Sequence, residues 1–177
     1  MFVAVLVPGK FLYLATPHTG SVSVARTLLE NVEGAASVGS HHATHDDVAD
    51  RLHGERLVTG VRNPYDLVVS WWTRTYAQSR WSSFHDFVRE WDEPVHVRNG
   101  RMFYHWRPGV QVLRFEELQK DFDTLLRRYK IPAVTLLHHN RSNERRLWSD
   151  YHDVESYELV NERFGAEIVE FGYEIRS

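Results

Sequence analysis

The chain contains no cysteine, which excludes disulfide bonds, thiolate catalysis and cysteine-based zinc sites. The G-x-x-x-x-G-K-[ST] pattern of a Walker loop is also absent. No apolar run approaches the length of a membrane span, and no basic segment with a cleavage site precedes the first apolar run. We therefore expect a cytoplasmic protein that has no membrane partner.

Lysine is scarce: only Lys10, Lys120 and Lys130 stand among 21 basic side chains, and the other 18 are arginines. Arginine offers a fixed fork of donors that suits phosphate or carboxylate, although a biased genomic composition explains the excess equally well. The net charge of −3 argues against a nucleic-acid partner. With 177 residues and 42% hydrophobic content, the sequence predicts a single domain over residues 1–177.

Short apolar runs alternate with helical patterns. Strands are predicted at residues 2–7, 11–15, 57–61 and 110–115, and the turn dipeptide Pro8-Gly9 predicts a hairpin between the first two. Nearly continuous apolar character indicates strands that are buried on both faces. The predicted class is therefore α/β, with a central, mostly parallel sheet flanked by helices.

Amphipathic patterns predict helices at residues 21–31, 64–78, 82–91, 116–129 and 154–171. A further helix of about ten residues is predicted after Thr44, which we expect as its N-cap, with Asp46 and Asp47 in its first turn. Residues 33–40 are expected as a loop or a short edge strand. Residues 92–108 and 131–149 show no clear period.

The segment from residue 11 to residue 28 predicts a strand, a tight loop and a helix. Its loop residues are Pro17, His18, Thr19, Gly20, Ser21, Val22 and Ser23. A loop of this kind gathers unpaired N–H groups at the positive end of a helix, where a phosphate or sulfate binds favourably. The alternative is an ordinary capped turn between strand and helix.

A second segment, VRNPYDLVVSWW, covers residues 61–72. Arg62 lies at the carboxyl end of a predicted strand, and Ser70 lies two turns into the next predicted helix. Together they can hold one phosphate, the arginine as a charged fork and the serine as a hydroxyl donor. In the alternative, Arg62 pairs with Asp66 and Ser70 only faces a neighbour.

These two segments resemble the sulfotransferase family that uses 3′-phosphoadenosine 5′-phosphosulfate (PAPS). VRNPYDLVVSWW resembles the motif that binds the 3′-phosphate, with Leu67 where an arginine is common, and TPHTGSVS resembles the 5′-phosphosulfate loop. VLRFEELQKDF and YELVNERFGAEIVEFGYE resemble later segments of the carbohydrate-type, bacterial and phage-like branches, so the resemblance spans residues 11–173. It implies a three-layer, P-loop-like fold.

The resemblance implies sulfuryl transfer from PAPS to an acceptor hydroxyl, for example on a glycan, leaving 3′-phosphoadenosine 5′-phosphate (PAP). It assigns the phosphosulfate to residues 17–23 and the 3′-phosphate to Arg62 and Ser70. The loop lysine of the family is replaced by His18. A protonated His18, or an arginine from elsewhere, would then stabilise the leaving phosphate. A nucleotide-binding protein that has lost catalysis is therefore an alternative function, and the missing Walker lysine disfavours a nucleotide kinase.

The catalytic base is expected among clustered histidines. HHATHDDV resembles the family's K-H-A-T stretch and places His42 on its histidine, with His41 and His45 as second choices. Alternatively, these are solvated histidines at a helix start. A metal site formed by three histidines fits the spacing but needs correctly oriented neutral rings, so we expect no metal.

A basic stretch follows near residue 140. It resembles the family loop that closes over the nucleotide, so Arg141, Arg145 or Arg146 could reach the 3′-phosphate. A solvated basic run is the alternative. Tryptophans could also stack on a sugar ring of the acceptor, although Trp71 and Trp72 are expected in the core. The other two candidates are Trp81 and Trp106.

Overall fold

The computed structural model describes residues 4–39, 43–74, 77–91, 97–137 and 147–177. The described residues within Met1–Val61 and His105–Arg141 form one compact unit, unit 1, and those within Arg62–Tyr104 and Ser142–Ser177 form a second, unit 2. The chain therefore passes from one unit to the other three times. We describe each unit by itself, and the single-domain organisation stays a prediction.

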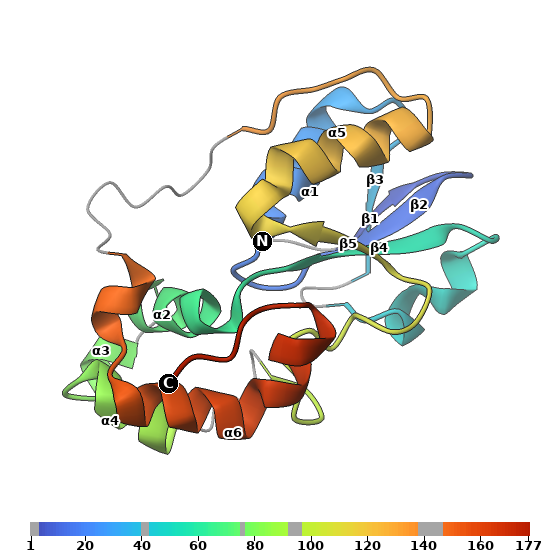
Figure 1. Ribbon diagram of the computed structural model, residues 1–177. Helices are drawn as coiled ribbons and strands as arrows, with labels where there is room; N and C mark the ends of the chain where they lie inside the picture. The colour runs from blue at the N-terminus through green and yellow to red at the C-terminus, as the bar shows by residue number, and fades with distance from the viewer. Residues whose placement is uncertain (1–3, 40–42, 75–76, 92–96, 138–146) are drawn as a thin grey trace. The chain divides into compact units, whose positions relative to one another are not determined.

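Unit 1 is an α/β unit built on a five-stranded mixed sheet in the order β3-β1-β2-β4-β5 (Figure 1). Its strands are β1 (Ala4–Val7), β2 (Phe11–Leu14), β3 (Ala36–Val38), β4 (Arg56–Val61) and β5 (Gln111–Arg114). β1 pairs antiparallel with both β2 and β3, whereas β4 runs parallel to β2 and to β5. The predicted hairpin is confirmed, and the short edge strand is present.

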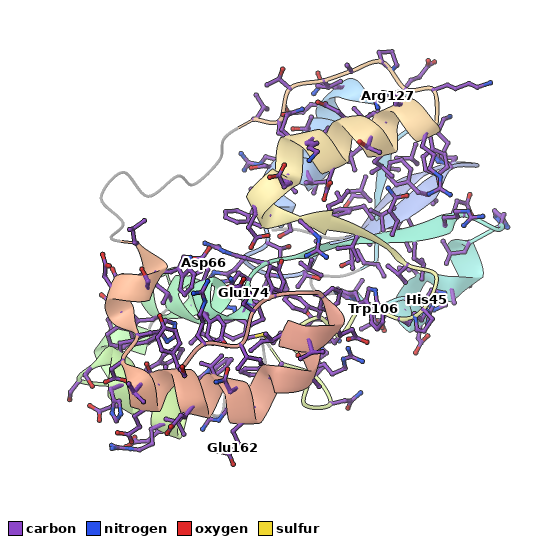
Figure 2. The ribbon with its side chains drawn as sticks, in the orientation of Figure 1. His45, Asp66, Trp106, Arg127, Glu162 and Glu174 are labelled. Atoms are coloured by element: carbon purple, nitrogen blue, oxygen red, sulfur yellow. The ribbon has the colours of Figure 1, made fainter. Side chains whose placement is uncertain are left out.

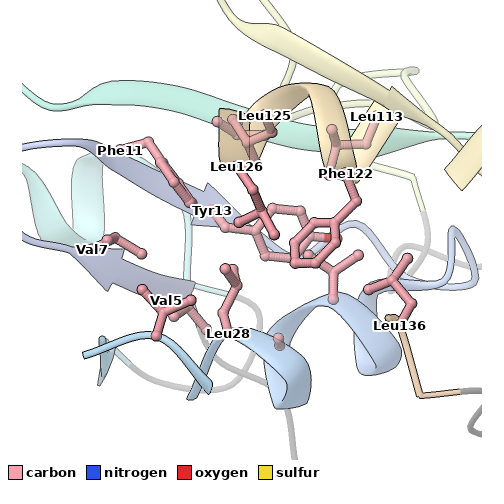
Figure 3. Close-up of a cluster of buried hydrophobic side chains, with 14 residues drawn as sticks. Val5, Val7, Phe11, Tyr13, Leu28, Leu113, Phe122, Leu125, Leu126 and Leu136 are labelled. Atoms are coloured by element: carbon pink, nitrogen blue, oxygen red, sulfur yellow. The ribbon is translucent and has the colours of Figure 1, made fainter. Parts of the chain in front are cut away.

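One face of this sheet is covered by α1 (Ser21–Asn31) and α5 (Leu118–Arg128) (Figure 3). Leu28 of α1 and Phe122 and Leu126 of α5 are fully buried against Phe11 and Tyr13 of β2. Burying a side chain of this size stabilises the fold by about 1.5–3 kcal/mol relative to leaving it exposed. This core fixes α1, and with it the loop that precedes α1.

The opposite face of the same sheet is covered by a different kind of element. Leu12 and Leu14 pack with Ala43 and with Val48 of the 3₁₀ helix η1 (Asp46–Arg51). The two faces of unit 1 are thus covered unequally, one by two α-helices and the other by an irregular segment.

Unit 2 is helical. It contains α2 (Pro64–Arg74), α3 (Ala77–Arg80), α4 (Phe84–Glu90), the 3₁₀ helix η3 (Trp148–Tyr151) and α6 (Val154–Glu170). α2 packs against α6, α4 and η3. Aromatic rings fill the space between α2 and α4: the ring centroids of Trp71 and Trp91 lie 4.4 Å apart, and those of Trp72 and Phe87 lie 5.7 Å apart.

Charged side chains of α6 hold the irregular parts of unit 2. The buried Glu167 carboxylate accepts the backbone N–H groups of Met102 and Phe103, each at 3.0 Å, and burial raises its pKa. Arg163 donates to the carbonyls of Val88 and Arg89 at 2.6 and 2.7 Å, which satisfies the C-terminal end of α4.

The structure corrects several predictions. The sheet is not mostly parallel, because the 11–15 strand returns on its neighbour through the tight Pro8-Gly9 turn and β3 adds a second antiparallel pair. The predicted 64–78 helix ends as α2 at Arg74, and the short α3 begins at Ala77. The predicted 116–129 helix begins with a 3₁₀ turn, η2 (Phe115–Glu117). Within the described residues no helix is long and apolar enough to cross a membrane.

The prediction of a ten-residue helix after Thr44 was also wrong. The helix found there is the six-residue η1, whose N-cap is His45 without a capping side-chain bond. Thr44 instead donates its backbone N–H and its hydroxyl to Asp47 Oδ2, at 2.7 and 2.8 Å. The carboxylate therefore reaches back to the residue that we expected to cap the helix.

Candidate functional site

The predicted anion loop leaves β2 and enters α1 through two left-handed residues. His18 has φ 62° and Gly20 has φ 76°. Glycine takes this conformation freely, whereas a residue with a Cβ atom is strained there by about 1–2 kcal/mol. Such strain persists only where the surrounding contacts fix the backbone, and it is frequent at ligand sites.

Buried hydroxyl groups fix this loop to β4. Thr19 is fully buried, and its Oγ1 donates to the Thr16 carbonyl at 2.9 Å. Thr59 donates to the Leu14 carbonyl at 2.9 Å, so the 2.8 Å bond between the Thr16 and Thr59 hydroxyls has Thr16 as its donor. A Cβ atom on Gly60 would lie 2.3 Å from Thr19 Oγ1, and this close approach requires glycine.

The loop ends at a helix N-terminus that has no side-chain cap, because the N-cap residue is Gly20. The first turn of α1 carries no acidic residue, and its first intrahelical bond runs from the Val24 N–H to the Gly20 carbonyl at 3.2 Å. Ser21 and Ser23 are buried beside these amides, with 6% and 8% of their surface exposed. Backbone amides, hydroxyl groups and the helix dipole therefore all favour an anion at this end of α1.

Tyr13, on β2 below the loop, supplies a further polar group. Burial raises the pKa of its phenol above the usual value, and its contact with the Thr19 side chain offsets part of that rise. The hydroxyl therefore stays protonated at every pH at which the protein is expected to work. It adds no charge to the loop.

The second predicted segment lies in unit 2. Arg62 is only 4% exposed, and its Nε donates to Asp66 Oδ2 at 2.6 Å, so the pairing foreseen as an alternative is present. Asn63 caps α2 by accepting the Tyr65 N–H at 3.0 Å, and Pro64 occupies the first helical position. Ser70 is buried in the same helix, one turn beyond Asp66.

His152 lies against the start of α2 and was missed by sequence reasoning. One ring nitrogen, Nε2, lies 3.1 Å from the Tyr65 carbonyl, and Nδ1 lies 3.2 Å from Ser156 Oγ. Since a carbonyl only accepts, Nε2 carries a proton. Burial lowers the pKa of His152, and the nearby Asp153 and Asp66 carboxylates oppose that shift.

Several predicted site residues lie outside the described residues. They are the expected base His42, its neighbour His41, and Arg141, Arg145 and Arg146. His45 is described; it is half-buried, and its Nδ1 lies 3.0 Å from Asp46 Oδ1 (Figure 2). In the part of the chain that the structure describes, no three side chains form a metal-binding group.

The tryptophans divide between core and surface. Trp71 and Trp72 are buried as predicted, and Trp81 is buried as well, with the Arg80 guanidinium 4.5 Å from the centre of its ring. With only 7% of its surface exposed, Trp81 offers little ring face for stacking on a sugar. Trp106 is half-buried and stays a candidate (Figure 2).

No protein-family model, curated protein or solved structure matches this chain. The resemblance to sulfotransferases therefore rests on the motifs alone. Some of the supporting residues could have been found in the sequence, because a glycine inside a strand, such as Gly60, signals a close approach of another chain segment. The threonine pairing and His152 carry no comparable signal, since both depend on contacts between residues at least 43 positions apart.

Proposed function

We propose that the protein is a sulfotransferase that moves a sulfuryl group from PAPS to an acceptor hydroxyl, for example on a glycan. The observation that carries the proposal is the uncapped N-terminus of α1, which follows two left-handed residues and has buried serines beside its amides. The finer fold assignment, a three-layer P-loop-like arrangement, belongs to the same proposal.

Each predicted segment is assigned one phosphate. The amides at the start of α1, with Ser21 and Ser23, bind the 5′-phosphosulfate. Arg62 and Ser70 bind the 3′-phosphate. Support for the second assignment comes from burial, because a guanidinium that is almost fully shielded from water forms stronger bonds to an anion than an exposed one.

The proposed chemistry is an in-line displacement at sulfur. The acceptor oxygen forms a bond to sulfur as the bond from sulfur to the 5′-phosphate oxygen breaks, and PAP leaves with that electron pair. His42 takes the acceptor's proton, a contribution of typically 10²–10⁴-fold in rate. Because the transition state is loose, positioning and charge stabilisation supply most of the catalysis.

Two measurements test the proposal. Calorimetry compares the binding of PAP with that of adenosine 5′-phosphate, which lacks the 3′-phosphate, and we expect PAP to bind at least tenfold more tightly. Transfer of radiolabelled sulfate from PAPS to a panel of sugars, phenols and peptides then tests catalysis. Equal affinity for the two nucleotides, together with no transfer, would refute the proposal.

A nucleotide-binding protein without catalysis is the second candidate, and the replacement of the family's loop lysine by His18 favours it. Measuring turnover against pH in the parent, His18→Lys and His18→Ala decides between the two. If His18 stabilises the leaving phosphate, the parent loses rate as its imidazole deprotonates, the lysine variant keeps its rate at higher pH, and the alanine variant is slowest. Tight PAP binding without turnover in any of the three proteins establishes the second candidate.

A further inference from the structure

We propose that Thr59 is a positioning residue, which holds the loop of residues 17–23 in the shape that receives the 5′-phosphosulfate. The inference rests on the proposed function, because it takes that loop as the 5′-phosphate site. Thr59 is a fully buried residue of β4 and acts through the loop, without being placed against the nucleotide itself.

Backbone pairing between β2 and β4 stops just before this loop. The last paired residues are Leu14 and Thr59, and the chain leaves the sheet at Ala15. The Thr59 side chain continues the attachment beyond that point, since its hydroxyl donates to the Leu14 carbonyl at 2.9 Å and accepts the Thr16 hydroxyl at 2.8 Å. One side chain of β4 therefore holds both the last residue of β2 and the second residue after it.

Thr16 passes this attachment on to the loop. Its carbonyl accepts the Thr19 hydroxyl at 2.9 Å, which closes a tight turn around the left-handed His18. The side chains of all three threonines are shielded from water, so water does not compete for these bonds. Gly60 adds a steric restraint, because it lies close against Thr19. Thr59 and Gly60 thus fix the first half of the loop to β4, one by a bond and the other by packing.

The second half of the loop is held differently. A Cβ atom on Gly20 would lie 2.5 Å from Leu118 Cδ2, so this half packs against the start of α5. The hydroxyl bonds therefore govern the turn that leads into Gly20 and the direction of the amides there. Amides bind an anion tightly when they are aligned before it arrives, because ordering a loop during binding costs conformational entropy.

Three variants separate positioning from stability. Thr59→Ser keeps the hydroxyl. Thr59→Val replaces the hydroxyl with a methyl group of similar shape and deprives the buried Thr16 hydroxyl of its acceptor. The double variant Thr16→Val/Thr59→Val removes that donor as well, and replacing both partners of a buried hydrogen bond by apolar groups is nearly neutral for stability.

The measured quantity is the ratio of the dissociation constant for adenosine 3′-phosphate to that for PAP, taken by calorimetry on the full chain. These nucleotides differ only in the 5′-phosphate, so this first ratio reports how well that group is recognised. A second ratio, for adenosine 5′-phosphate over PAP, reports the 3′-phosphate and serves as an internal control. Melting temperatures are recorded for every variant.

We expect Thr59→Val to lower the first ratio about three- to tenfold, the weight of one hydrogen bond, and to lower the melting temperature. The double variant should show the same lowered ratio while it regains part of the lost melting temperature. Thr59→Ser should keep the parent's ratio, and the second ratio should stay unchanged in all three. The matched control is Thr124→Val, which removes an exposed hydroxyl that donates to the Lys120 carbonyl within α5 and should change neither ratio.

Recovery of the first ratio together with the melting temperature in the double variant would overturn the positioning role, because Thr59 would then act through stability alone. An unchanged first ratio in Thr59→Val, or an equal loss in both ratios, would also overturn it. If the valine variants fail to fold, NMR of the ligand-free parent is the test. The Thr59 hydroxyl proton should exchange slowly with solvent and the Gly20 amide should show one conformation, whereas rapid exchange or several conformations would overturn the inference. A parent that binds adenosine 3′-phosphate as tightly as PAP instead refutes the 5′-phosphate site of the proposed function.

Discussion

The two candidate phosphate-binding segments are built on opposite principles. The loop of residues 17–23 presents backbone amides and small hydroxyl groups, and its shape depends on left-handed residues and on Gly60. The segment that begins at Arg62 presents a charged side chain that is held by a buried carboxylate. The first is therefore sensitive to changes in backbone space, and the second to the loss of one charge.

Removal of Arg62 should have the largest effect. Arg62→Ala leaves Asp66 buried without its partner, and breaking a buried pair in this way lowers the free energy of unfolding by about 3–5 kcal/mol. In the folded fraction, PAP binding should weaken about ten- to a hundredfold more than binding of adenosine 5′-phosphate. Denaturant unfolding and calorimetry measure the two effects.

The matched control is Arg127→Ala, because Arg127 is an exposed arginine on α5 (Figure 2). It should change neither quantity by more than the experimental error. Equal weakening of both nucleotides by Arg62→Ala would make Arg62 purely structural and would remove the contrast between the two segments.

Added volume at Gly60 should have the next largest effect. In Gly60→Ala the new methyl group meets Thr19 Oγ1 at 2.3 Å, and the crowding should lower the free energy of unfolding by about 1–3 kcal/mol. PAP affinity should fall as the loop shifts. In the control, Gly165→Ala, the new Cβ meets nothing within 4 Å in the middle of α6, so stability should rise by up to about 1 kcal/mol. Destabilisation of similar size in both variants would contradict a role for close packing at Gly60.

A smaller effect is expected from the strain at His18. Because φ is 62° there, His18→Gly should be about 1 kcal/mol more stable than His18→Ala in thermal or denaturant unfolding. The reverse order is expected at Ala166 of α6, where Ala166→Gly should lower stability by about 1 kcal/mol. If the protein with alanine is more stable than the protein with glycine at both positions, residue 18 does not adopt the left-handed conformation.

The smallest effect concerns pH. Burial lowers the folded-state pKa of His152, so the unfolded chain binds more protons in the window between that pKa and the unfolded value of about 6.5. Stability is complete above about pH 6.5 and is lost as the pH falls through the folded-state pKa. Melting temperatures measured from pH 8 to pH 5 should therefore fall less steeply in His152→Gln than in the parent. His53→Gln, at an exposed position, should melt like the parent throughout.

Local signals in the sequence predicted the local structure well. The apolar runs predicted all the strands except β3, whose segment was expected as either a loop or a short edge strand. Asn63-Pro64 correctly predicted the start of α2. Strand direction was predicted less well, because nearly continuous apolar character indicates burial on both faces and says nothing about whether neighbours run parallel. The helix expected after Thr44 failed for a different reason, since the segment that contains η1 is held by Val48 packing on the sheet and not by its own propensity.

The candidate site was predictable only in part. The loop and Arg62 stood out because their residue types suit anions. The contacts that hold them in place join residues between 41 and 87 positions apart in the sequence. These contacts are the hydroxyl pairing of Thr16 with Thr59, the close approach of Gly60 to Thr19, and the contact of His152 with α2. Such contacts leave no periodic pattern in a single sequence.

The order of pairing in the sheet has a consequence for the rate of folding. β1 and β2 are joined by a tight turn, so they can meet within microseconds, as other hairpins do. β2 and β4 are far apart in the sequence, since their pairing sets Leu14 opposite Thr59. β4 and β5 are separated by the 62–104 segment of unit 2, which must form a long loop before these two strands can pair. Closing such long loops costs entropy before any contact is gained. We therefore expect the hairpin to form early and β5 to be added late, so that amide protons of β5 acquire protection from hydrogen exchange after those of β1 and β2 during refolding.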